Sequence, residues 1–91
     1  MIYTELKPKL YKQKSYYNKA MIQEVNGGLN LYSYGVEMVN IRKGKLVNLN
    51  SNPENYTQTT LKHVKDFLYQ TLGLENLTKS ELLKMEKELQ K

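Results

Sequence analysis

An apolar stripe at helical spacing is the feature of this sequence that most restricts its fold. Between positions 57 and 72 the apolar side chains recur every three or four residues, at Leu61, Val64, Leu68 and Leu72, with Phe67 beside this stripe. This period places them along one side of an α-helix. The pattern predicts an amphipathic helix over residues 57–72 whose stripe packs against the rest of the domain.

Capping signals mark the ends of this helix and the start of another. One of the threonines at positions 57–60 can accept a hydrogen bond from a free backbone amide, and Gly73 is a natural stop. Thr78 and Glu81 form a capping box that opens a second, shorter helix over residues 79–90.

Strand signals fill residues 19–50. Asn26-Gly27-Gly28 predicts a tight hairpin turn, because Asn-Gly readily supplies two positive φ angles. The first strand ends at this turn, and the second begins with an alternating sequence after it. At Gly35 the alternation slips, which we interpret as a bulge or bend within one strand that continues to Ile41.

A further turn and loop complete the pattern. Lys43-Gly44-Lys45 predicts a second turn, and residues 46–49 a third strand. Residues 50–55 are a loop by composition. The sequence thus predicts an α+β fold, a three-stranded antiparallel β-meander packed on a long helix, with a short carboxy-terminal helix and a basic amino-terminal arm.

The expected organisation is one small domain preceded by the arm. The arm covers residues 1–18, is rich in Tyr and Lys, and contains Pro8, which interrupts helical spacing. Residues 19–91 form a single small α+β domain, with strands at about 19–50 and helices at about 57–72 and 79–90. The open edges of a three-stranded sheet could pair across a homodimer.

Composition narrows the class of protein. The 91 residues suit one domain, and the absence of cysteine removes disulfides and thiolate metal sites. No apolar run is long enough for a transmembrane helix, and the amino terminus lacks a secretion-signal pattern. We therefore expect a protein of the host-cell cytoplasm with no membrane partner.

Charge is unevenly distributed along the chain. Residues 1–45 contain eight Lys or Arg against three acids, whereas residues 46–91 contain six of each, so the net charge of +5 belongs to the first half. A basic segment of this kind is typical of a surface that meets a polyanion.

Tyrosine provides the candidate binding residues. The chain has eight Tyr, one Phe and no Trp, and Tyr is enriched at protein interfaces. The candidate partner-binding residues are Tyr16, Tyr17, Tyr32, Tyr34, Lys43 and Lys45. Tyrosines interleaved with lysines are also typical of single-strand binders; this alternative uses Lys7, Lys9, Lys12, Lys14, Lys19 and Tyr11. The alternative is a purely structural role, in which the tyrosines cover sheet edges and fill a half-buried core.

No catalytic or metal-binding constellation is visible. His63 is the only histidine, and it borders the apolar stripe. Catalysis would need an orienting group and a nucleophile, and zinc would need more ligands. We expect His63 to be a structural side chain bonded to the threonine-rich turn or the sheet, and the protein to be a non-enzyme without cofactor or metal.

Three segments carry a resemblance to known proteins. They are Ser15-Tyr16-Tyr17-Asn18-Lys19-Ala20, then Leu31-Tyr32-Ser33-Tyr34, then Tyr56 to Leu68 with its Thr-Thr-Leu-Lys-His-Val core. In these segments the chain resembles small proteins of phages and mobile elements of Gram-positive bacteria that share a domain of unknown function. The resemblance implies that the protein belongs to a phage or mobile element, and it implies no mechanism.

Two functions follow as expectations. The first is a phage or mobile-element accessory protein that binds a host protein or nucleoprotein complex, plausibly an anti-CRISPR-like inhibitor of a defence system. The alternative is a protein that binds single-stranded RNA or DNA directly.

Overall fold

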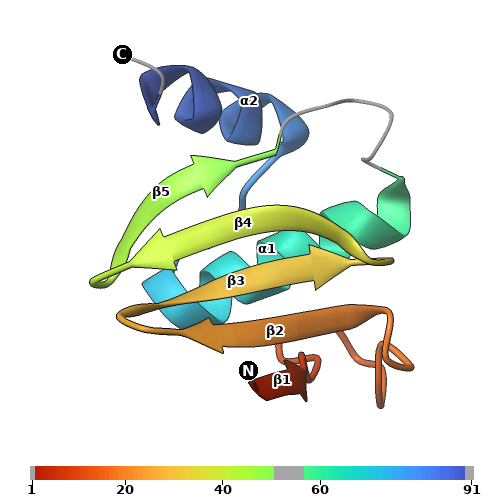
Figure 1. Ribbon diagram of the computed structural model, residues 1–91. Coiled ribbons are helices and arrows are strands. Elements are labelled where there is room, and N and C mark those ends of the chain that lie inside the picture. Colours follow the sequence, from red (N-terminus) through yellow and green to blue (C-terminus); the bar gives the residue numbers. More distant parts are fainter. Residues whose placement is uncertain (1, 51–56, 90–91) are drawn as a thin grey trace.

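The computed structural model describes residues 2–50 and 57–89 and contains one antiparallel sheet with two helices (Figure 1). The five strands lie side by side in chain order. They are β1 (Ile2–Glu5), β2 (Ala20–Val25), β3 (Gly28–Ser33), β4 (Val36–Arg42) and β5 (Lys45–Leu49). Helix α1 (Gln58–Leu72) crosses one face of the sheet, and α2 (Lys79–Leu89) lies beside β5.

The prediction of three strands on a long helix was wrong, since the sheet has five strands and both helices are short. The first additional strand, β1, lies within the predicted basic arm and pairs with β2 from Ile2↔Glu24 to Glu5↔Met21. Its four residues are too few to reveal an alternating pattern, and its partner lies beyond a loop in the sequence.

The second additional strand arises because the chain reverses at Tyr34–Gly35, where a bulge within one strand was expected. Both residues have positive φ, 51° and 78°, as in the tight turns that join neighbouring strands. Tyrosine rarely adopts this conformation, so sequence alone does not predict the turn. Bulges do occur elsewhere, between Leu31 and Tyr32 and between Asn40 and Ile41.

The Asn26–Gly27 hairpin is confirmed, because Val25 pairs with Gly28 across it. Only Gly27 of its two central residues has positive φ. Gly28 is required for a different reason, since a Cβ there would lie 2.0 Å from the backbone oxygen of Ile41. Only glycine permits so close an approach of two strands.

The core lies between the sheet and the helices. Its fully buried members on α1 are Val64 and Leu68 of the predicted apolar stripe and Phe67 beside it. The sheet and loops add the remaining core side chains Leu6, Tyr16, Ala20, Leu31, Met38, Val39, Ile41 and Leu49, and α2 contributes Leu82.

Both helices begin at the predicted capping residues. The Thr57 side chain accepts from the Thr60 amide at 3.2 Å, and Gly73, in the left-handed conformation, ends α1. At α2, Thr78 Oγ1 accepts from the Glu81 amide at 3.2 Å.

Candidate functional site

The segment between β1 and β2, residues 6–19, is a loop fixed to α1 by one buried carboxylate. We call it the lysine loop. Asp66 of α1 is fully buried, and its oxygens accept from the backbone amides of Lys9 at 3.0 Å and Leu10 at 3.2 Å. They also accept from Tyr16 Oη at 2.6 Å and Gln70 Nε2 at 2.9 Å. Four donors from the loop and the helix therefore satisfy one buried charge.

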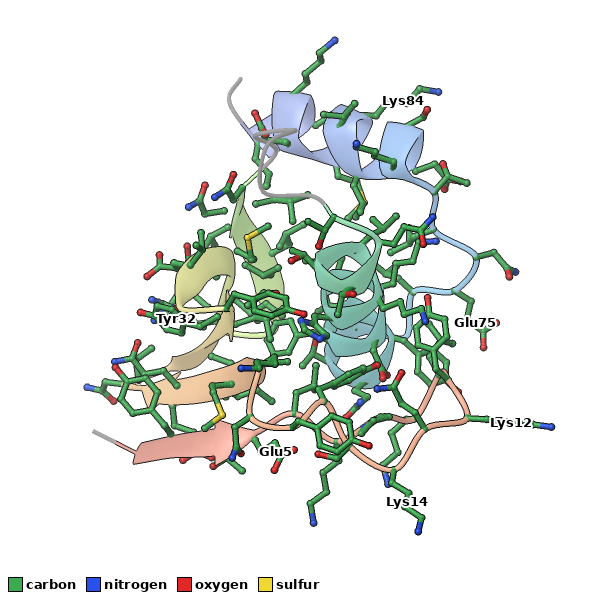
Figure 2. The ribbon with its side chains drawn as sticks, turned by 90° about the vertical axis from the view of Figure 1, so that its right-hand side faces the viewer. Glu5, Lys12, Lys14, Tyr32, Glu75 and Lys84 are labelled. Atoms are coloured by element: carbon green, nitrogen blue, oxygen red, sulfur yellow. The ribbon has the colours of Figure 1, made fainter. Side chains whose placement is uncertain are left out.

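The lysine loop concentrates positive charge. It contains five lysines and no acidic residue, and all five lysines are exposed: Lys7, Lys9, Lys12, Lys14 and Lys19. Figure 2 shows Lys12 and Lys14 extending away from the body of the molecule. Lys62 of α1 lies beside the loop, with its Nζ 5.4 Å from the centre of the Tyr11 ring, within reach of a cation–π contact.

Two exposed tyrosines lie at one end of the sheet, Tyr17 within the lysine loop and Tyr34 in the turn between β3 and β4. Tyr17 is 74% exposed and Tyr34 is 52% exposed. The Tyr34 amide donates to the Lys19 backbone oxygen at 2.8 Å, which joins their two turns. We call Tyr17, Tyr34 and Lys19 the two-tyrosine end.

Both tyrosines have left-handed backbone conformations. The φ angle is 52° at Tyr17, followed by 62° at Asn18, and 51° at Tyr34, followed by 78° at Gly35. Left-handed conformations cost a bulky residue free energy and recur at binding sites. These turns direct two aromatic side chains outwards at positions where Asn or Gly would be less strained.

A buried polar cluster lies directly beneath the two-tyrosine end. His63 of α1 is fully buried. Its Nδ1 lies 2.8 Å from Ser33 Oγ, and the Ser33 hydroxyl donates to Thr60 Oγ1 at 3.1 Å. The imidazole nitrogen and the two hydroxyls thus form one continuous hydrogen-bonded chain. The expectation that His63 is bonded to the sheet is confirmed.

His63 also connects the cluster to the surface through aromatic contacts. Its ring meets the Tyr16 ring edge-on, with centroids 4.5 Å apart, and the Tyr34 ring at 5.8 Å. The cluster unites side chains from the three segments that carry the family resemblance: Tyr16, Ser33, Tyr34, Thr60 and His63. These segments, distant in sequence, therefore build one end of the molecule.

The cluster does not have the geometry of a catalytic triad. Ser33 is almost fully buried, so a substrate cannot reach its hydroxyl. A triad also needs a carboxylate bonded to the second imidazole nitrogen. His63 Nε2 is instead buried with no hydrogen-bond partner among the described residues, while Asp66 accepts from the four donors named above.

Burial lowers the pKa of His63 to about 4, and the nearby charge of Asp66 opposes this shift only in part. Burial, together with the hydrogen bond to Asp66, raises the pKa of the Tyr16 hydroxyl well above its ordinary value. Both side chains are therefore neutral at physiological pH.

A pH dependence of stability follows. In the unfolded chain His63 titrates near 6.5, so between pH 6.5 and 4 the unfolded state binds more protons than the folded state. The stability contributed by neutral His63 is complete above pH 6.5 and is lost as pH falls, by up to about 3 kcal/mol. Urea unfolding measured from pH 7.5 to 5 should show this loss.

The matched variant for this experiment is His63→Gln. The groups that face His63 are Asp66, Tyr16, Tyr34 and Ser33, and the variant leaves them in place. Its unfolding free energy should change less than that of the wild type between pH 6.5 and 5. Parallel curves for the two proteins would contradict a buried neutral histidine.

The structure divides the predicted binding residues among different places. Tyr16 is 2% exposed, so the prediction that it binds a partner was wrong: its hydroxyl is held by Asp66 inside the domain. Tyr32 is half-buried on the open sheet face, where its hydroxyl donates to Glu37 at 2.9 Å. Tyr17 and Tyr34 are together at the two-tyrosine end.

The two lysines predicted to border that site are elsewhere. Lys43 and Lys45 are exposed at the turn between β4 and β5. This turn is at the opposite end of the sheet from Tyr34, separated by the length of β3 (Figure 1), about 17 Å at the usual rise per residue. The residues of the nucleic-acid alternative, in contrast, all belong to the lysine loop.

Sequence reasoning missed a row of amides on the open face of the sheet. Gln23, Asn30, Asn40 and Asn48 are successive register partners across β2 to β5. The amide nitrogen of each asparagine donates to the side-chain oxygen of the preceding member, at 3.0, 2.6 and 2.9 Å. The signal, one amide per strand on the same face, becomes visible only when the register of all four strands is known.

The amide row has a structural consequence. Three of its members, Gln23, Asn30 and Asn40, are buried although α1 covers the other face. Because the amides bond to one another and Arg42 Nη1 donates to Asn30 Oδ1 at 2.9 Å, this face needs no covering helix to satisfy its polar groups.

Within residues 2–50 and 57–89, neither helix has the length and hydrophobicity that a membrane span requires. In the same residues, no three His, Asp or Glu side chains are grouped so that they could hold a metal ion.

Comparison with known proteins places the chain in a family. The model of a family of unknown function (DUF8033) matches residues 4–86. The chain belongs to DUF8033. The matched range runs from β1 into α2 and thus includes the lysine loop, the two-tyrosine end and the buried cluster. Membership of DUF8033 agrees with the resemblance to proteins that share a domain of unknown function. No curated protein and no solved structure gives a significant match.

Proposed function

We propose that this protein is a non-enzymatic binding protein whose ligand is nucleic acid, bound by the lysine loop. The observation that carries the proposal is that Asp66 holds the lysine loop against α1 by hydrogen bonds. The five lysines of this loop are exposed, and the loop contains no acidic residue. Within the described residues, none of these lysines forms an ion pair with the protein's own carboxylates. Their charge is therefore available to a polyanion.

The fixed conformation of the loop supports this ligand. A flexible lysine tail loses conformational entropy when it binds, whereas a loop already ordered by three hydrogen bonds to Asp66 loses less. Phosphate contacts provide most of the affinity of nucleic-acid-binding proteins, and lysines on an ordered loop can make several at once.

Lys12→Ala/Lys14→Ala tests the proposal. The affinity of the wild type for a labelled oligonucleotide, measured by fluorescence anisotropy, should fall steeply as salt rises. The slope of log K against log[salt] should be smaller in the double variant by about 1.4, since each phosphate contact on a single strand contributes about 0.7.

The charge-matched control is Lys84→Ala/Lys87→Ala on α2. It removes the same charge from exposed positions away from the loop, as the place of Lys84 in Figure 2 shows. This variant should keep the wild-type slope. Equal changes in the two variants would mean that net charge alone is responsible, and absence of salt-dependent binding in the wild type would refute the proposal.

A second candidate ligand is a host protein or nucleoprotein complex. This would suit an accessory protein of a phage or mobile element that inhibits a defence system in the host cytoplasm. Its support is the exposed apolar surface at the two-tyrosine end, where Val36 follows the Tyr34–Gly35 turn and is itself exposed, because tyrosines are frequent interface hot spots. A host complex that survives nuclease treatment and high salt, and is lost in Tyr34→Ala, would favour this ligand.

A further inference from the structure

The two exposed tyrosines specify the kind of nucleic acid more narrowly. We infer that the ligand is single-stranded and that its unpaired bases stack on Tyr17 and Tyr34. This inference rests on the proposed function, since it assigns the ligand class at the same surface. A base in a duplex is already stacked on its neighbours, whereas an unpaired base can stack on an aromatic side chain.

The position of the tyrosines supports this assignment. The Tyr34 amide is bonded to the backbone of Lys19, the last residue of the lysine loop, and Tyr17 precedes Lys19 by two residues. A chain whose phosphates contact the loop lysines would therefore bring its bases to the tyrosines. Single-strand-binding proteins combine these two features, a basic track and adjacent aromatic side chains.

The structure also limits how the Tyr34 ring can move. Tyr34 packs on the His63 ring, which is in turn held by Ser33 and by the edge of Tyr16. A ring supported from below loses little conformational freedom when a base covers its outer face. The buried cluster thus acts as the support of the binding surface, which gives a role to the otherwise unexplained polar side chains under it.

The left-handed backbone conformations of Tyr17 and Tyr34 also support base stacking. Glycine or asparagine would fit the φ angles of 52° and 51° with less strain than tyrosine. Both tyrosines are also largely exposed, so they add little to the core. Contact with a ligand supplies a reason for aromatic residues at these two places.

The test compares a labelled single-stranded oligonucleotide of about 20 nucleotides, longer than the site size of a typical single-strand-binding domain, with its own duplex. Charge alone favours the duplex, which has the higher charge density. Stacking predicts that the single strand binds at least about tenfold tighter than the duplex.

The tyrosine variants make the test specific. Tyr17→Ala and Tyr34→Ala should each weaken single-strand binding about 5- to 150-fold, the range for loss of one stacked base, with little effect on the duplex. Tyr17→Phe and Tyr34→Phe should keep the wild-type affinity. Tyr3→Ala is the control, because Tyr3 is 51% exposed but lies on β1, and it should change neither affinity. Thermal unfolding followed by circular dichroism verifies that each variant is folded.

Failure of this inference can be separated from failure of the proposed function. Equal or tighter binding of the duplex, with no effect of either alanine variant, would overturn stacking and leave the lysine loop as the site. Absence of salt-dependent binding to both oligonucleotides would overturn the two proposals together.

Discussion

Replacing Asp66 with alanine is expected to lower the free energy of unfolding by about 3–5 kcal/mol, since it removes the shared acceptor of four donors, among them the buried Tyr16 hydroxyl. The donors are the amides of Lys9 and Leu10, the Tyr16 hydroxyl and the Gln70 amide. The total free energy of unfolding of a native protein is only about 5–15 kcal/mol. This variant should therefore unfold at a much lower urea concentration than the wild type.

A double-mutant cycle with Tyr16→Phe tests the mechanism of this loss. Tyr16→Phe removes one donor but keeps the ring that packs in the core. If Asp66 acts through these hydrogen bonds, Tyr16→Phe should destabilise the wild type clearly and the Asp66→Ala background by much less. Additive effects would mean that the two side chains do not depend on each other.

Asp66→Ala also has a functional consequence. Without the carboxylate, the lysine loop loses three hydrogen bonds to α1 and keeps the one from Gln70 to the Lys7 oxygen, so its lysines are less well ordered before the ligand binds. Nucleic-acid affinity should therefore fall even at temperatures where the variant is folded. Unchanged affinity in the folded variant would contradict the importance of a pre-ordered loop.

Phe67→Ala is expected to cost about 3–5 kcal/mol for a different reason, the cavity left in the core. Phe67 is the largest of the fully buried side chains and lies between α1 and the sheet. Phe67→Leu, which retains much of the volume, should cost less, about 1–2 kcal/mol. Both values can be measured by urea unfolding at neutral pH.

The contrast between the two positions separates stability from function. The Phe67 side chain belongs to the apolar core, so Phe67→Ala should retain the affinity for nucleic acid wherever it is folded. If Phe67→Ala leaves the free energy of unfolding almost unchanged, the buried face of α1 is wrongly assigned. A loss of affinity as large as that of Asp66→Ala would mean that the lysine loop depends on the whole core rather than on the carboxylate.

Features determined by neighbouring residues could be predicted from the sequence. The threonine cap at Thr57, the glycine stop at Gly73 and the hairpin at Asn26–Gly27 each depend on the backbone preferences of a few residues. The helical spacing likewise identified Val64, Phe67 and Leu68 as buried.

Features determined by distant residues could not be predicted from the sequence. Strand β1 is recognisable only through its pairing with β2, and the Tyr34–Gly35 turn uses a conformation that tyrosine seldom adopts. The role of Asp66 could not be predicted, because its amide donors come from residues 56 and 57 positions away in the chain. Tyr16 was placed on the surface for the same reason, since its partner belongs to another element.

The most direct test of the account is an NMR titration of the ¹⁵N-labelled protein with a short single-stranded oligonucleotide at low salt. We expect amide shifts concentrated in the lysine loop, residues 6–19, and at Tyr34 and Gly35, with α2 unaffected. Shifts confined to α2 and β5, or no shifts at all, would contradict it.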